Sequence, residues 1–291
     1  MSRYDEYDYL DVSVEEGVAV VEIGNPGYTM RGHYEVNSIW RDLDRDPEVR
    51  AAILTWAVPA KEPLGAHYPP EMGPEAAAED PAKWWSRWHW PFKEAREGIR
   101  DLLDANFLVV SALRGDVTYG ASLVLATLAD VSIAAEDCVI ADRHLDAAMV
   151  AGDGAVHWSL LCGVQKAKYL ALTSDEISGK EAERIGLVSL CFPDEEVMPQ
   201  ARRLARKFAD GPQHAQHYTK RTFNQTLRQT SLLGMEFGLA YEALNIVGDP
   251  DVAKAAEWGK AEQGEPRGYD IDERPPMPSV SKPYGPGELR P

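Results

Sequence analysis

Two polar residues in the middle of the chain have side chains suited to the activation of water. His144 is followed nine residues later by Asp153, which stands in the run Ala151-Gly152-Asp153-Gly154. An aspartate can orient an imidazole ring and stabilise its protonated form, and the imidazole can then take a proton from water. Hydrolytic triads use the same arrangement of a basic imidazole and an orienting carboxylate, with serine in place of water. A histidine with only a structural role is the alternative for His144.

A second unusual segment is rich in tryptophan. Residues 67–93 contain Trp84, Trp85, Trp88 and Trp90, which are half of the chain's eight tryptophans. Because indole rings bury a large apolar surface, the segment can be a loop anchored on the core. It can also be a hydrophobic lid over an apolar substrate. The two interpretations are compatible, and both stay open.

The composition limits the classes of function. The formal net charge of −17 repels nucleic-acid backbones, so DNA and RNA are not expected partners. No apolar run approaches the ~20 residues of a membrane-spanning helix, and the acidic N-terminus does not resemble a targeting peptide. The three widely spaced cysteines suggest no disulfide framework, and no residue spacing is typical of a metal site. We therefore expect a cytoplasmic protein without metal or membrane contact.

The hydrophobic pattern predicts the elements that position these residues. Alternation on both sides of Glu15-Glu16-Gly17 predicts a β-hairpin over residues 8–23. The pattern then predicts short buried strands at 51–56, 107–113 and 131–134, and helices near 33–44, 94–104 and 121–129. This alternation of strands and helices indicates an α/β core. Later helices are expected at 195–209, 212–228, 231–247 and 250–262.

Three regions follow from these patterns. Residues 1–200 form the expected core, in which 67–93 is the tryptophan-rich loop or lid. Residues 201–263 form a helical region. Residues 264–291 contain seven prolines and four glycines without apolar periodicity, which is typical of an extended tail.

A series of segments in a fixed order resembles the crotonase (enoyl-CoA hydratase/isomerase) superfamily. The stretches that match are AAILTW, FLVVSALRG, YGAS, LVLATLAD, VSIAAEDCVIA, GDGAVHWSLLCGVQKAKYLALT and ISGKEAERIGLVSLCFP. Their order and spacing are more specific than any one stretch, and the resemblance covers about residues 8–262. It implies a spiral of β-β-α turns and a helical C-terminal region that helps to build a homotrimer or a dimer of trimers.

The resemblance also implies an oxyanion hole made of two backbone N–H groups. One belongs to Leu64 or Gly65, and the other to Gly120 or Ala121. Small residues at a strand-to-helix turn let the backbone approach a substrate, and the following helix adds the positive end of its dipole. Such donors stabilise a developing oxyanion by ~3 kcal/mol or more. The side chains expected to line the substrate pocket are those of Trp84, Trp88 and Tyr119.

The acids of a hydratase are missing from the matching positions. Enoyl-CoA hydratases use two glutamates, where this chain has Leu123 or Val124 and His144. The pattern His144…Gly-Asp-Gly resembles instead the branch of 6-oxocamphor hydrolase and related β-diketone hydrolases. There a histidine–aspartate pair activates water for a retro-Claisen cleavage. The segment GLAYEAL resembles that branch's segment with a further acid, which falls on Glu242; a solvent-facing glutamate is the alternative.

Three functions stay open. The first is a C–C bond hydrolase that acts without a cofactor on an apolar β-diketone, which can be cyclic, through His144, Asp153 and Glu242. The second is an enzyme on an acyl-CoA thioester, although the single Lys61 in the loop after residues 51–56 gives little support for a CoA site. The third is a non-catalytic binding protein of the same fold. The expected partners are a small apolar ketone or an acyl-CoA, and further copies of the chain.

Overall fold

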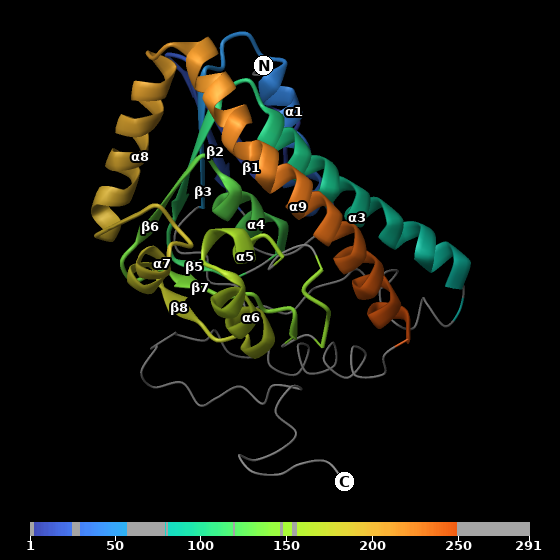
Figure 1. The fold of residues 1–291 in the computed structure, drawn as a ribbon. Helices are drawn as coiled ribbons and strands as arrows, with labels where there is room; N and C mark the ends of the chain where they lie inside the picture. The colour runs from blue at the N-terminus through green and yellow to red at the C-terminus, as the bar shows by residue number, and fades with distance from the viewer. Residues whose placement is uncertain are drawn as a thin grey trace.

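Two β-sheets organise the part of the chain that the structure describes (Figure 1). This computed structural model describes residues 3–24, 30–56, 79, 81–118, 120–145, 148–152 and 156–248. Within the helices, the side chains of residues 30–31, 81–91, 120–122, 230–232 and 246–248 lie outside this description.

The larger sheet has the strand order β1-β2-β3-β4-β6-β9. Its strands are β1 (Leu10–Glu15), β2 (Val18–Ile23), β3 (Ala51–Trp56), β4 (Leu108–Leu113), β6 (Val131–Ala135) and β9 (Leu190–Phe192). β1 and β2 form the predicted hairpin, and Glu16 and Gly17 between them have positive φ angles of 48° and 82°, as a two-residue hairpin turn requires. From β2 to β9 all neighbours are parallel. β3 is buried along its whole length, which explains its uninterrupted apolar sequence.

The smaller sheet consists of β5 (Asp116–Val117), β7 (Val139–Ile140) and β8 (Ile177–Ser178) in the order β5-β7-β8. The chain passes from β4 to β5 and later from β6 to β7, so successive turns each give one strand to each sheet. This repeated passage is the spiral that the family resemblance predicted. β5 and β7 are parallel neighbours, so the segments that follow them leave from the same edge of the sheet.

Helices cover both faces of the larger sheet (Figure 1). They are α1 (Met30–Asp44), α3 (Pro81–Asp104), α4 (Gly120–Leu128), α5 (Trp158–Leu161), α6 (Val164–Thr173), α7 (Gly179–Ile185), α8 (Asp194–Ala209) and α9 (Gln213–Gly248). α8 packs on one face, and α4, with α1, α3 and α9 beside it, lies on the other. Acidic residues in the first turn of α8 and basic residues in its last turn complement the helix dipole. Among the helices that the structure describes, none is long and apolar enough to span a bilayer.

Two helices are longer than the sequence pattern predicted. α3 begins at Pro81, so residues 81–93 are helical and not part of a loop; proline suits a first helical turn. α9 continues without a break from Gln213 to Gly248, whereas two helices separated near residues 229–230 were expected. The segment between them contains neither proline nor glycine, so nothing there stops the helix. The predicted helix 250–262 and the tail 264–291 lie outside the described residues.

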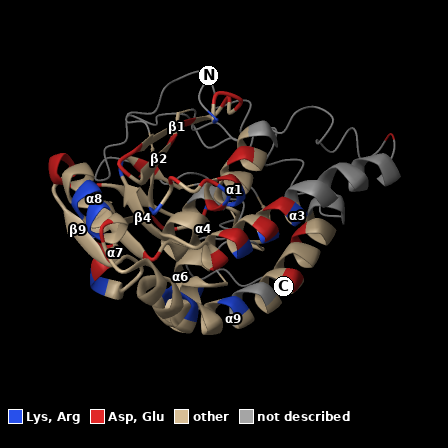
Figure 2. Cartoon of the chain, turned by 90° about the horizontal axis from the view of Figure 1, so that it is seen from above, with Lys and Arg blue, Asp and Glu red and all other residues tan. Residues whose placement is uncertain are grey.

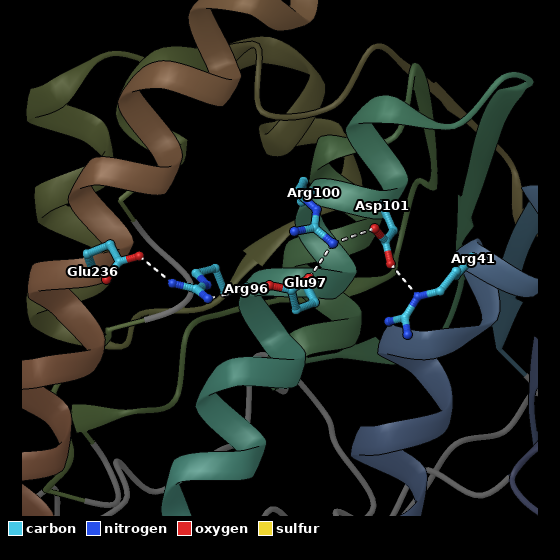
Figure 3. Close-up of polar contacts among 6 residues, drawn as sticks. All are labelled: Arg41, Arg96, Glu97, Arg100, Asp101 and Glu236. Atoms are coloured by element: carbon cyan, nitrogen blue, oxygen red, sulfur yellow. Dashed lines mark hydrogen bonds and ion pairs between the residues drawn. The ribbon is translucent and has the colours of Figure 1, made fainter.

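Ion pairs connect α3 with its two neighbouring helices (Figure 3). Arg41 of α1 bonds Asp101 of α3 at 3.0 Å, and Arg96 of α3 bonds Glu236 of α9 at 2.6 Å. Exposed pairs of this kind stabilise a fold by only about 0–1 kcal/mol each. They therefore fix the relative orientation of the helices more than they add stability.

A buried lysine attaches the N-terminal half of α9 to the core. The Lys220 ammonium lies 3.0 Å from Oδ2 of Asp130 and donates to the carbonyl oxygen of Phe107 at 2.9 Å. One turn further on, the side-chain amide of Asn224 donates to the carbonyl oxygen of Leu103 at 3.0 Å. Paired in this way, the buried charge is tolerated, and α9 has a defined register against the sheet.

Charged side chains are distributed unevenly over the surface. Acidic residues gather around β1 and the N-terminal turn, whereas α8 has a run of basic residues (Figure 2). That run consists of Arg202, Arg203, Arg206 and Lys207.

Candidate active site

The imidazole of His144 contacts a buried aspartate. Nδ1 of His144 is 2.6 Å from Oδ1 of Asp142, and the backbone N–H of His144 donates to the same oxygen at 3.1 Å. The second bond closes a short turn in which an aspartate side chain bonds the backbone two residues ahead. The side chain of Asp142 is 4% exposed and that of His144 is 14% exposed. A buried carboxylate therefore holds an imidazole that keeps some access to its surroundings.

The charge of Asp142 determines which nitrogen of His144 is basic. Burial raises the pKa of the Asp142 carboxyl, but the charge of His144 and its two hydrogen bonds outweigh burial, so this pKa lies below its ordinary value. Asp142 is therefore a carboxylate, which can only accept hydrogen bonds. The proton of the neutral imidazole then resides on Nδ1, and Nε2 has the basic lone pair.

A second imidazole lies near the same carboxylate. His157 has no solvent exposure, and burial lowers its pKa to about 4, although the charge of Asp142 acts in the opposite direction. At neutral pH the ring of His157 is therefore uncharged. Of the two histidines beside Asp142, only His144 is exposed enough to meet a substrate.

The small sheet fixes the segment in which His144 stands. β7 ends four residues before His144 and is paired on both sides, with β5 and with β8. The neighbouring Arg143 forms a largely buried ion pair with Glu176, which directly precedes β8. Backbone pairing and this ion pair together hold the turn of Asp142 and His144 in place.

The predicted second oxyanion turn lies at the same edge of this sheet. α4 begins at Gly120, three residues after the end of β5. Because β5 and β7 are parallel neighbours, the N-terminus of α4, with Gly120 and Ala121, and the turn of His144 both follow strands that end at one edge. The positive end of the α4 dipole is thus directed towards this edge.

Glu242 of α9 is buried, so the interpretation as a solvent-facing glutamate is wrong. Its exposure is 4%, and a Cβ atom built on Gly152 would lie 2.5 Å from its Oε2 atom. One turn further along α9, Asn245 accepts a hydrogen bond from the backbone N–H of Val150 at 3.0 Å. The carboxylate of Glu242 therefore lies against the loop that leads directly to Asp153.

Several predicted site residues lie outside the residues that the structure describes. They are Asp153, the first oxyanion donors Leu64 and Gly65, and Tyr119. Trp84 and Trp88 belong to α3, but their side chains lie outside the described part. The roles predicted for all of these residues stay predictions.

The position of the first hydratase acid is filled by apolar side chains. Leu123 and Val124 of α4 are 3% and 2% exposed and belong to the hydrophobic core. Neither side chain can transfer a proton, and both are needed for packing.

Asp142 is the site residue that the sequence interpretation missed. The pairing of His144 with Asp153 stays a prediction, because Asp153 lies outside the described residues; within them, the ring of His144 contacts an aspartate two residues before it. A signal was present, because an aspartate just after a buried strand commonly bonds the backbone two residues ahead. Whether the imidazole also turns to that carboxylate depends on side-chain conformation, which the sequence does not report.

A cavity of about 580 Å³ lies away from these residues. It opens between α9 and the beginnings of β4 and β6, and Phe208, Lys220 and Phe223 are among the residues that line it. Its lining contains none of the predicted site residues. The ammonium of Lys220 is engaged by Asp130 and by the Phe107 carbonyl, so this cavity is not assigned to the reaction.

Comparison with known proteins identifies the family. The sequence model of the enoyl-CoA hydratase/isomerase family matches residues 13–241. The chain belongs to this family, and with it to the crotonase superfamily.

Solved structures of two kinds resemble the fold. One is the crystal structure of an enoyl-CoA hydratase/isomerase from Mycobacterium paratuberculosis. It matches this chain with a TM-score of 0.75 and 25% sequence identity, and the match covers 88% of this chain and 100% of that protein's chain. Another is the structure of a β-diketone hydrolase from the cyanobacterium Anabaena sp. PCC 7120, bound to (S)-3-oxocyclohexyl acetic acid. It matches this chain with a TM-score of 0.71 and 25% sequence identity, and the match covers 84% of this chain and 96% of that protein's chain.

Curated relatives match over a shorter stretch. A protein of Dictyostelium discoideum, named as a probable mitochondrial enoyl-CoA hydratase, is 29% identical over 138 residues, which are 47% of this chain and 50% of that protein. The chain spans about half the length, or less, of the curated relatives it matches first.

Proposed function

We propose that the protein is a hydrolase that cleaves a carbon–carbon bond of a β-diketone with water activated by His144. The observation that supports this most strongly is the His144 imidazole itself. It stands at the position of a hydratase acid, and a buried carboxylate 2.6 Å from Nδ1 leaves Nε2 as the basic nitrogen. The similarity to the β-diketone hydrolase of Anabaena, over 84% of this chain, agrees with the same chemistry.

The proposed reaction balances with water as the only co-reactant. Nε2 of His144 takes a proton from water while the water oxygen adds to one carbonyl carbon. The bond between that carbon and the central carbon then breaks, and its electron pair forms the enolate of the second ketone. The imidazolium returns its proton to the central carbon. An open-chain diketone gives a carboxylic acid and a ketone, and a cyclic diketone gives one keto acid.

Backbone N–H groups have the role of stabilising the enolate oxygen in this proposal. The N-terminus of α4 supplies one donor from Gly120 or Ala121, and Leu64 or Gly65 supplies the other. Donors fixed before the reaction need no reorganisation as charge develops, which is the reason that they accelerate it. Glu242 is proposed to hydrogen-bond or protonate the substrate, and Asp153 to assist the imidazole from the loop that Glu242 contacts.

An enzyme on an acyl-CoA thioester is the second candidate. Membership of the enoyl-CoA hydratase/isomerase family and the structure from Mycobacterium paratuberculosis favour it. Such an enzyme would still use His144, because Leu123 and Val124 cannot supply a proton. Stabilisation of the protein by CoA or acetyl-CoA at sub-millimolar concentration, measured by thermal shift, would favour this candidate over the first.

A hydrolysis assay with labelled water tests the proposal. The purified protein is incubated with cyclic and open-chain apolar β-diketones in H₂¹⁸O, and the products are analysed by mass spectrometry. We expect one ¹⁸O atom in the new carboxylate and a loss of about 10³-fold or more in rate for His144→Ala. His214→Ala, at an exposed position of α9, is the matched control and keeps the wild-type rate. Full activity of His144→Ala on a genuine substrate would show that the proposed base is wrong.

A further inference from the structure

The reaction needs a group that orients the His144 ring, and the structure contains one that was not predicted. Oδ1 of Asp142 meets both Nδ1 and the backbone N–H of His144, at 2.6 Å and 3.1 Å. A single oxygen thus fixes the backbone of the turn and the plane of the ring. Because the backbone contact holds the turn in place, rotation of the ring would break the contact at Nδ1.

The surroundings of Asp142 are suited to holding a charge without moving. Its carboxyl is buried, and its charge interacts with both His144 and His157. Because His157 has no solvent exposure and a pKa of about 4, it stays neutral and does not compete for the proton of His144. The negative charge of Asp142 is therefore available to stabilise the imidazolium that forms when His144 takes a proton from water.

The backbone that holds Asp142 is fixed independently of the substrate. β7 ends two residues before Asp142 and has a paired strand on each side. The side chain of Arg143, between Asp142 and His144 in the chain, forms its ion pair with Glu176. A group fixed in this way can orient a catalytic side chain before substrate arrives.

We propose that Asp142 is a positioning residue of the reaction: it accepts a hydrogen bond from Nδ1–H of His144, fixes the tautomer with basic Nε2, and stabilises the imidazolium. This inference rests on the proposed function, because it takes His144 as the base. It differs from the prediction from sequence, which gave the orienting role to Asp153.

The tautomer of His144 can be observed directly by ¹⁵N NMR of the histidine side chains in the full-length protein near pH 7.5. The signal of His144 is identified by its loss in His144→Gln. We expect the wild-type ring to have its proton on Nδ1. Asp142→Asn should shift the ring towards the tautomer with the proton on Nε2, whereas Asp153→Asn should leave the Nδ1-protonated form in place. A wild-type ring with its proton on Nε2, or a tautomer change in Asp153→Asn alone, would overturn the proposal.

Kinetics give a second readout. We expect Asp142→Asn to lower kcat by about 10²- to 10⁴-fold with little change in KM, as expected for a residue that acts through the base. Near-UV circular dichroism checks that the variant is folded. If it does not fold, the wild-type tautomer still decides the proposal. A folded Asp142→Asn with wild-type kcat would contradict it.

The two proposals fail in different ways. If the protein hydrolyses no diketone but turns over an acyl-CoA thioester, the proposed function is wrong, while the tautomer measurement still tests Asp142. If diketones are cleaved and Asp142→Asn changes neither tautomer nor kcat, the proposed function stands and the role of Asp142 is wrong.

Discussion

Gly152 and Gly238 pack backbone against backbone, so closely that neither position has room for a side chain. A Cβ atom on Gly152 would lie 2.6 Å from the carbonyl oxygen of Gly238, and one on Gly238 would lie 2.3 Å from the carbonyl oxygen of Gly152. The contact joins α9 to the loop that precedes Asp153. It is also the reason that Glu242, one helical turn after Gly238, reaches this loop.

We expect Gly238→Ala to separate α9 from this loop. The added methyl group meets backbone atoms that cannot move aside like the end of a flexible side chain, so the free energy of unfolding should fall by about 1–3 kcal/mol. The rate on a diketone should also fall, because Glu242 loses its contact with Gly152. Urea unfolding and the hydrolysis assay measure the two effects. Gln225→Ala, at an exposed position of the same helix, should change stability by less than about 0.5 kcal/mol.

The buried carboxyl of Glu242 should matter for the reaction, and an exposed glutamate of the same helix should not. We expect Glu242→Gln to lower kcat at least about tenfold, since the amide cannot donate a proton as a carboxylic acid does. Glu236→Gln, with a side chain 57% exposed and paired with Arg96, is the matched control and should keep the wild-type rate. Equal rates for the wild type and Glu242→Gln would remove Glu242 from the proposed mechanism.

The buried His157 should make the protein less stable in weak acid. Burial lowers its pKa from 6.5 to about 4, so between these values the unfolded chain binds a proton that the folded protein excludes. The stability present above pH 6.5 is therefore lost as the pH falls towards 4, by roughly 3 kcal/mol in total. Urea unfolding at pH 7, 5.5 and 4.5 measures this slope. In His157→Gln the slope over this interval should be smaller, and an unchanged slope would show that other groups cause it.

Between residues 233 and 244, α9 exposes a row of large apolar side chains. The side chains of Leu233, Phe237, Tyr241 and Leu244 are 68%, 69%, 60% and 68% exposed, and their spacing places them along one side of the helix. The family resemblance predicts a homotrimer or a dimer of trimers, and we expect this face to lie in its interface. Sedimentation velocity should show an oligomer for the wild type and smaller species for the double variant Phe237→Glu, Tyr241→Glu. A monomeric wild type at micromolar concentration would be contrary to this expectation.

Much of the fold could be predicted from the sequence because it depends on local patterns. The hairpin around Glu16-Gly17, the buried strand Ala51–Trp56 and the helix at 195–209 follow from hydrophobic period and turn chemistry. The lengths of α3 and α9 could not be predicted as well. Each helix continues through residues whose intrinsic propensities favour neither helix nor loop strongly. Packing against the neighbouring helices stabilises the helical conformation there.

The sequence by itself determined that His144 stands where a hydratase acid is absent, and that Leu123 and Val124 cannot replace that acid. Only the tertiary structure decided that the His144 ring contacts the carboxylate of Asp142 and that Glu242 is buried against Gly152, 90 residues before it in the chain. The physical reason is that residue types determine which chemistry is available. Contacts between side chains depend on burial and on the packing of distant segments, which no local pattern encodes.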